Sequence, residues 1–186
     1  MARYPTLGRV KTRLACDIGK AGALRVYRQL LEHHRREFRQ TPFDVEWRYT
    51  PARAPFRRLV RHAKPQPPGD LGERMRRIFE ESFARGYRRV VMIGTDAPEM
   101  NQVSARHAFD LLGGYGAVFQ PTRDGGYALI GLRAVLDVFS GIAWSTNQVM
   151  MQTRRRLRAL GVQHAELPGT FDVDTAADLA RLLPQR

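Results

Sequence analysis

The chain has 186 residues, 43% of them hydrophobic, and a formal net charge of +13 at pH 7. This length suits one domain with a sizeable core, so we expect a single domain over residues 1–186. The sequence has no run of about 18 apolar residues and no apolar signal-peptide region at residues 1–5, so we expect neither a membrane-spanning helix nor a secretory leader. Cys16 is the only cysteine, so an internal disulfide is excluded and a reducing, cytoplasmic location is expected.

The basic residues are almost all arginine, because Lys11, Lys20 and Lys64 are the only lysines among 31 lysines and arginines. Such a charge favours an anionic partner: a nucleic acid, a nucleotide or a phosphorylated substrate. The arginines are spread over most of the expected helices, so the charge alone indicates little. The sequence has no RNA-binding aromatic signature, helix-turn-helix or zinc-finger spacing, which argues against nucleic acid.

A loop with alternating cations opens the chain. Pro5 and Gly8 mark residues 3–13 as a loop. Arg9, Lys11 and Arg13 alternate along it, just ahead of an expected helix. A glycine-containing basic loop before a helix can cradle a pyrophosphate. A solvated basic loop is the alternative interpretation.

Hydrophobic periodicity predicts alternating helices and strands. Residues 20–39 carry apolar side chains at three- and four-residue steps, which predicts a helix. Residues 44–49 alternate, which predicts a strand toward one edge of a sheet, and prolines exclude regular structure over 64–70. Further helices are expected near 56–62, 71–85, 101–112 and 149–160 (with Ser145 or Thr146 as N-cap) and from Thr175, and strands near 90–93, 115–120, 127–131 and 162–167.

The segment around Asp96 is the strongest candidate for a binding site. Residues 90–93 are all apolar and predict a strand buried on both faces. Asp96 would then lie at the carboxyl end of a central strand, where open α/β sheets bind ligands. A carboxylate there can hold a divalent cation. The alternative is that Asp96 serves as an Asx-turn or N-cap residue.

Two further acidic segments carry a similar ambiguity. Asp124 precedes two glycines and an alternating apolar run, which predicts a hairpin turn. As a carboxylate at a strand end it could also share a metal or act as a base. Thr175 and Asp178 fit a capping box, which leaves Asp172 and Asp174 unexplained. Two acids two residues apart in an extended segment point the same way and could reach one cation.

Several stretches in this order resemble one family: residues 3–15, 70–75, 94–98, 124–132, 144–146 and 172–175. They are similar to the small GT-A-type transferases related to 2-phospholactate guanylyltransferase and molybdenum cofactor guanylyltransferase. The particular group is the radical SAM/selenodomain-associated transferases, also called arsenosugar biosynthesis glycosyltransferases. The resemblance implies a three-layer α/β nucleotide-diphospho-sugar transferase (GT-A) fold, with a mostly parallel sheet and helices on both faces.

The resemblance also implies roles for individual residues. A nucleotide site is implied at Gly8, Arg9, Lys11, Arg13, Asp70 and Arg74, and an acceptor site at Gly125, Gly126, Tyr127 and Trp144. Asp96, Asp172 and Asp174 match ligands of Mg or Mn, and Asp124 is the candidate catalytic base.

One feature departs from the family pattern. Relatives begin with a strand before the basic loop, whereas only Met1 and Ala2 precede Arg3 here. A strand typically has about 5–6 residues, so the first strand is predicted to be missing. The exposed sheet edge would invite a second copy to pair, giving a homodimer.

The expected function is a metal-dependent transferase with a nucleotide-activated donor and a small-molecule acceptor. Attack at a sugar carbon would make it a glycosyltransferase, which is our first hypothesis. Attack at the α-phosphorus would make it a nucleotidyltransferase of the guanylyltransferase kind, which the sequence does not separate from the first. A non-catalytic or nucleic-acid-binding basic protein is the third hypothesis.

Overall fold

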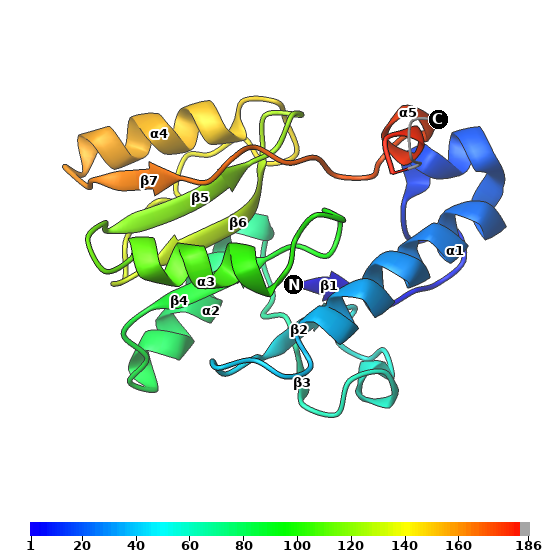
Figure 1. Cartoon of the computed structure of the whole chain (residues 1–186), viewed down its shortest axis with the longest axis horizontal. Helices are drawn as coiled ribbons and strands as arrows, with labels where there is room; N and C mark the ends of the chain where they lie inside the picture. The colour runs from blue at the N-terminus through cyan, green and yellow to red at the C-terminus, as the bar shows by residue number, and fades with distance from the viewer. Residues whose placement is uncertain (183–186) are drawn as a thin grey trace. The chain divides into compact units, whose positions relative to one another are not determined.

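The computed structural model describes residues 1–182 and shows an α/β fold (Figure 1). Its elements follow the order β1 (Ala2–Arg3), α1 (Thr12–Glu37), β2 (Trp47–Thr50), the 3-10 turn η1 (Phe56–Arg58), β3 (Ala63–Pro65), α2 (Leu71–Ala84), β4 (Val90–Ile93), α3 (Gln102–Leu111), β5 (Ala117–Pro121), β6 (Tyr127–Leu132), α4 (Val149–Ala159), β7 (His164–Glu166) and α5 (Ala176–Ala180).

The chain forms two compact units. The first contains Met1–Pro65, Gly94–Asn101 and the chain from Phe171 onward. The second contains Gln66–Ile93 and Gln102–Thr170. Each is described by itself below. No helix within residues 1–182 has both the length and the apolar character that crossing a bilayer requires.

The first unit is built on a parallel sheet with the order β1-β2-β3. β2 is the central strand of the three, so the expectation that this strand lies toward an edge is wrong for this sheet. Lys64 and Pro65 belong to β3, although the prolines predicted an irregular segment there. Pro65 ends the strand, where a missing N–H is tolerated. Tyr49 stacks on the buried Phe56 ring with 5.0 Å between centroids and closes the core under this sheet.

The first strand has two residues, and the outward backbone groups of Arg3 are satisfied by Tyr27. Ala2 and Arg3 pair with Tyr49 and Thr50 of β2. The Tyr27 hydroxyl of α1 donates to the Arg3 carbonyl and accepts from the Arg3 N–H, both at 2.8 Å. A strand was expected to be absent here; a two-residue strand is present instead. Because Tyr27 satisfies the outward backbone groups of Arg3, that residue offers no free edge to a second copy.

Helix α1 extends further toward the N-terminus than its periodicity predicted. Residues 20–37 match the expected helix, but Thr12 already begins α1, and Gly19 interrupts it with φ 76° and ψ 159°. That left-handed φ suits glycine and separates a short helical segment before it from the long helix after it. The buried side chains of α1 contact Phe171 and Val173, which anchors the late segment of the first unit.

The second unit holds a four-stranded sheet with the order β4-β6-β5-β7. β6 pairs antiparallel with β4 and β5, and β5 pairs parallel with β7, so only β6 runs against the other strands. The sheet is therefore mostly parallel in strand direction, as expected. α2 and α3 contact β4, and α4 lies alongside β7 (Figure 1), where Arg154 and Glu166 form two hydrogen bonds of 2.7 Å.

β4 differs from the prediction for residues 90–93. It is an end strand of its sheet, and only Met92 among its residues is buried. The prediction of a central strand buried on both faces is therefore wrong for this sheet. A run of four apolar residues could not reveal how the chain distributes its strands between two sheets.

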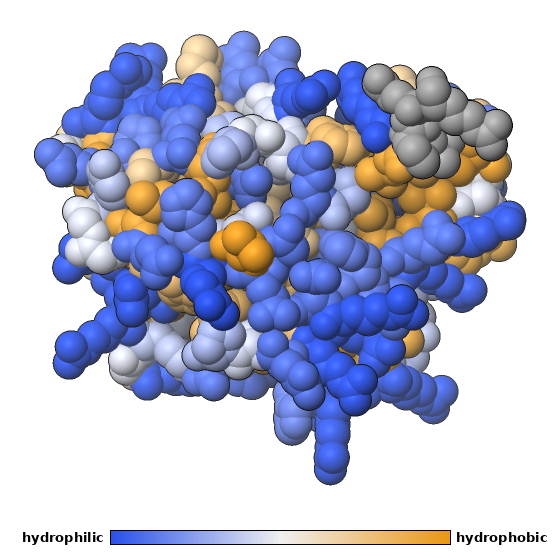
Figure 2. All heavy atoms as spheres, in the orientation of Figure 1, coloured by the Kyte–Doolittle hydropathy of each residue, from blue (hydrophilic) through white to orange (hydrophobic). Residues whose placement is uncertain are grey.

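The helix ends show which local signals were reliable. Thr175 and Asp178 form the predicted capping box at α5. Gln148, and neither Ser145 nor Thr146, is the N-cap of α4, and Ser145 adopts a left-handed φ of 63°. Hydrophilic residues cover most of the face shown in Figure 2, consistent with the high charged fraction of the chain.

Candidate functional site

The basic loop ends in a strained residue at the start of α1. Lys11 is the N-cap of this helix, and its φ of 47° and ψ of 50° place it in the left-handed region. Gly8 also has a positive φ, 69°. A non-glycine residue in this conformation costs about 1–3 kcal/mol and is often found at functional sites. The conformation places the Lys11 side chain toward the acidic segments of the first unit.

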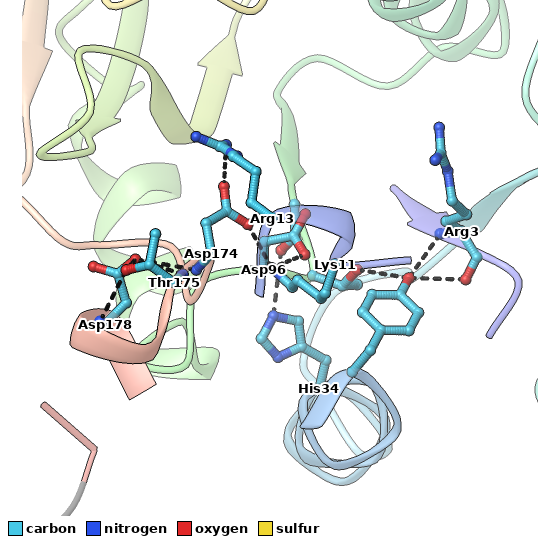
Figure 3. Close-up of polar contacts among 11 residues, drawn as sticks. Arg3, Lys11, Arg13, His34, Asp96, Asp174, Thr175 and Asp178 are labelled. Atoms are coloured by element: carbon cyan, nitrogen blue, oxygen red, sulfur yellow. Dashed lines mark hydrogen bonds and ion pairs between the residues drawn. The ribbon is translucent and has the colours of Figure 1, made fainter. Parts of the chain in front are cut away.

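Two acids far apart in sequence meet at Lys11 (Figure 3). The Lys11 Nζ lies 2.5 Å from Asp96 Oδ1 and 3.2 Å from Asp174 Oδ1. Arg13 pairs with the other oxygen of Asp174. The backbone also joins these segments, because the Val173 N–H donates to the Asp96 carbonyl at 3.1 Å. The predicted convergence of Asp96 and Asp174 beside the basic loop is therefore present.

Burial divides this cluster unequally. The Lys11 side chain is 3% exposed, whereas that of Asp96 is 48% exposed and that of Asp174 is 25% exposed. Burial lowers the pKa of Lys11, but Asp96 and Asp174 outweigh it, and the pKa is raised overall. Lys11 therefore stays protonated at neutral pH, while the solvent-facing Asp96 oxygens remain accessible to a ligand.

The late acidic segment contributes through Asp174. This residue supplies the carboxylate that meets both Lys11 and Arg13. Its N–H donates to Asp178 Oδ2 at 3.2 Å, which ties it to the α5 capping box. Asp172 is half-buried two residues earlier, and its predicted role as a metal ligand stays a prediction.

The donor set bears on whether a divalent cation suits this site. Within residues 1–182, no three His, Cys, Asp or Glu side chains are grouped as metal ligands. Magnesium, however, is commonly held by one or two protein carboxylates completed by substrate phosphates and water. Asp96 and Asp174 already converge on one ammonium cation, so they fit such a two-carboxylate site.

Side chains of helix α1 contact the segment that carries Asp96. The His34 Nε2 lies 3.2 Å from the Gly94 carbonyl, the Tyr27 hydroxyl lies 3.5 Å from Thr95 Oγ1, and the His33 Nε2 lies 3.2 Å from the Met100 carbonyl. The sequence predicted no site role for these residues of α1. The available signal was that His34 follows Leu30 by four residues on the apolar side of the helix.

Asp124 lies in the hairpin between β5 and β6. Its Oδ1 accepts from Thr122 Oγ1 at 2.5 Å and from the Gly126 N–H at 3.2 Å. The hairpin-turn interpretation is thus confirmed, and these bonds orient the carboxylate within the second unit. Gly125 has φ 87°, and a Cβ there would lie 2.0 Å from the Asn147 carbonyl oxygen. The turn therefore requires glycine at this position.

The other predicted acceptor residues, Tyr127 and Trp144, are neighbours in the second unit. Their rings meet edge to face with centroids 6.4 Å apart. Trp144 also packs against Gly72 of α2, where a Cβ would lie 2.5 Å from the indole nitrogen. The Tyr127 hydroxyl is buried and has no hydrogen-bond partner among the described residues, and burial raises its pKa.

Asp70 and Arg74 help to form the start of α2. Asp70 accepts from the Glu73 N–H at 2.9 Å, and the Glu73 carboxylate accepts from the Asp70 N–H at 2.9 Å. Arg74 Nε donates to the Gly69 carbonyl at 2.7 Å. These contacts explain Asp70 as the N-cap of α2 and Arg74 as a side chain that ties the helix to the preceding loop, and their nucleotide role stays a prediction.

The chain has the α/β fold of the nucleotide-diphospho-sugar transferases. A solved structure of a candidate nucleotide-diphospho-sugar transferase from Desulfovibrio desulfuricans G20 is 34% identical, matches 98% of this chain and 83% of its own, and has a TM-score of 0.92. Rv0371c from Mycobacterium tuberculosis H37Rv is 19% identical over 83% of this chain and 82% of its own, with a TM-score of 0.57, a likeness of fold alone.

A family match gives the finer assignment. Residues 31–146, more than half of the chain, match the family described as "Uncharacterized protein conserved in bacteria (DUF2064)". The chain belongs to the DUF2064 family. No functionally curated protein matches it. The broad transferase relationship predicted from the motifs is confirmed, and the narrower arsenosugar assignment stays a prediction.

Proposed function

We propose that this chain is a metal-dependent transferase that uses a nucleotide-activated sugar as donor and a small molecule as acceptor. The observation that carries the proposal is the single Lys11 ammonium shared by Asp96 and Asp174, with Arg13 beside it. A cluster of two acids and two cations can bind both a divalent cation and a diphosphate. The similarity to the candidate nucleotide-diphospho-sugar transferase supports this choice of donor.

The acids and the cations of the cluster would have different roles. Asp96 and Asp174 would hold Mg²⁺ or Mn²⁺, which supplies charge stabilisation for a departing phosphate when bound. A divalent cation held by these carboxylates would replace the Lys11 ammonium as their counter-charge. Lys11 would then be free to bind a donor phosphate together with Arg13 and the loop at Gly8 and Arg9. These cations offset the negative charge that develops on the leaving group.

Residues of the second unit would serve the acceptor. Asp124 is the candidate base that removes a proton from the acceptor hydroxyl. Gly125, Gly126, Tyr127 and Trp144 would bind the acceptor. Asp70 and Arg74, at the start of α2, would bind the nucleotide. These roles rest on the resemblance of the motifs.

Product analysis tests the proposal and separates its two chemical forms. The protein is incubated with Mn²⁺ and a panel of nucleotide sugars and nucleoside triphosphates, with candidate hydroxyl acceptors. Release of a nucleoside diphosphate supports glycosyl transfer, and release of pyrophosphate supports nucleotidyl transfer instead. If no nucleotide alters the thermal midpoint with or without Mn²⁺, the proposed function is wrong. RNA binding that weakens steeply with salt would then favour the polyanion-binding alternative.

A further inference from the structure

One face of α1 holds the peptide that carries Asp96. Tyr27 and His34 are seven residues apart, about two helical turns, and so project from the same side of the helix. The His34 Nε2 lies 3.2 Å from the Gly94 carbonyl, and the Tyr27 hydroxyl lies 3.5 Å from Thr95 Oγ1. These contacts fall on the two residues directly before Asp96. Figure 3 shows His34 pointing from α1 toward the Asp96 segment.

The hydrogen bond of His34 has a defined direction. A carbonyl oxygen only accepts, so Nε2 carries the proton and donates it to Gly94. His34 is 0% exposed, and its Nδ1 is buried without a hydrogen-bond partner among the described residues. An aliphatic side chain would fill this position without burying an unpartnered nitrogen. The residue type is therefore explained by the N–H that it gives to Gly94, and not by packing alone.

The same peptide is held from a second direction. The Val173 N–H donates to the Asp96 carbonyl at 3.1 Å. His34 therefore holds the backbone carbonyl of Gly94, Tyr27 contacts the Thr95 side chain, and Val173 holds the backbone at Asp96 itself. Between these supports the Asp96 side chain extends to the Lys11 ammonium, 2.5 Å away. A loss of either support would let the carboxylate turn away from Asp174.

We propose that His34 and Tyr27 are positioning residues that hold the Asp96 carboxylate in register with Asp174 for cation binding. The proposal rests on the proposed function, because it takes Asp96 and Asp174 as the cation ligands. It adds two side chains of α1 that touch neither the donor nor the cation. Neither residue carried a functional prediction from the sequence.

The test measures Mn²⁺ binding to the purified full chain by electron paramagnetic resonance, without any donor. His34→Leu, which lacks a donor, should weaken Mn²⁺ binding about 10-fold, the scale seen when residues that orient metal ligands are removed. His34→Gln keeps an N–H donor and should restore most of the affinity. Tyr27→Phe should give a smaller loss. In an Asp96→Asn background, His34→Leu should have no further effect.

Leu31→Ala is the matched control. Leu31 is buried on the same helix and packs in the hydrophobic cluster with Ala2, Tyr49, Phe56 and Ala63. This variant should lower the thermal midpoint and keep the wild-type Mn²⁺ affinity. If His34→Leu is too unstable to purify, Tyr27→Phe, together with the ¹⁵N signature of a His34 ring protonated at Nε2, carries the test.

The outcomes separate this inference from the proposed function. Wild-type protein that binds no Mn²⁺ overturns both. If the wild type binds Mn²⁺ and His34→Leu binds it equally well, the positioning role is wrong and the cation site is supported. Where Tyr27→Phe carries the test, an unchanged Mn²⁺ affinity in that variant has the same meaning. An equal loss of affinity in Leu31→Ala also overturns it, because the effect would then follow general stability.

Discussion

Lys11 and Asp96 form an ion pair of 2.5 Å in which the cation is almost fully buried and the carboxylate is half exposed. The carboxylate of the pair is therefore accessible to a ligand, whereas the lysine is shielded from solvent. Asp174 shares the same ammonium at 3.2 Å. One positive charge thus holds two acids that would otherwise repel each other.

Replacing Lys11 tests this arrangement directly. Lys11→Met should tighten the binding of Mn²⁺ alone several-fold, because the internal cation no longer competes for the two carboxylates. The same variant should weaken the binding of a nucleoside diphosphate in the presence of Mn²⁺, because a phosphate contact is lost. Isothermal titration calorimetry measures both. Lys64→Met is the control, since Lys64 is a half-exposed lysine that pairs with Glu46 and should leave both affinities unchanged. A parallel loss of both affinities would contradict the competition.

The two late acids make a second comparison. Asp174→Asn should weaken Mn²⁺ binding strongly, because Asp174 shares Lys11 with Asp96. Asp172→Asn should have a smaller effect, because Asp174 is the late acid whose carboxylate lies 3.2 Å from the Lys11 ammonium that Asp96 also contacts. Both variants are read by Mn²⁺ titration followed by electron paramagnetic resonance. A larger loss in Asp172→Asn would assign the ligand to the other acid and would require Asp174 to serve only as an anchor for Arg13.

The sequence was most informative where one local signal determined one local structure. The hairpin at Asp124 and the capping box at Thr175 formed as predicted, since each depends on a few neighbouring residues. Asp96 and Asp174 come together through contacts between distant segments: the Val173 N–H donates to the Asp96 carbonyl, and both carboxylates contact Lys11. Motifs in the correct order were enough to indicate the fold of the chain.

Long-range features could not be predicted in the same way. The pairing of strands into two sheets depends on tertiary contacts that no local pattern records, so the place of β4 was misjudged. The left-handed backbone conformation of Lys11 could not be predicted either, because a lysine in a basic loop favours no particular pair of backbone dihedral angles. The role of His34 was hidden for a related reason: a histidine in an apolar stripe shows burial but not its partner.

Two glycines with similar backbones allow the turn at Asp124 to be tested. Gly125→Ala should destabilise the protein by more than about 3 kcal/mol, because it adds a steric clash with the Asn147 carbonyl to a strained left-handed conformation. Gly86→Ala is the control, because Gly86 has φ 92° and open space around a Cβ. Only the cost of the strained backbone, about 1 kcal/mol of stability, is expected there. Urea unfolding gives both free energies. Equal losses would show that the backbone of Asn147 moves aside at little cost.

His34 should make stability depend on pH in a known direction. Burial, with His33 nearby, lowers the pKa of His34 to about 4 from an ordinary value of 6.5. Below pH 6.5 the unfolded chain therefore binds a proton that the folded chain rejects, so stability falls as pH drops toward 4. The full effect is at most about 3 kcal/mol. Above pH 6.5 the residue is neutral in both states and adds no pH dependence.

The measurement compares wild type with His34→Gln by urea unfolding between pH 4 and 8. Glutamine does not titrate and keeps an N–H for Gly94, so the variant should lose less stability than wild type as pH falls from 6.5 to 4. The acids with lowered pKa values, such as Glu32, are the same in both proteins and cancel in the difference. Parallel curves across this range would mean that His34 takes up its proton at the same pH in the folded and the unfolded chain. Its ring would then need a second acceptor for the proton on Nδ1, which the described residues do not supply.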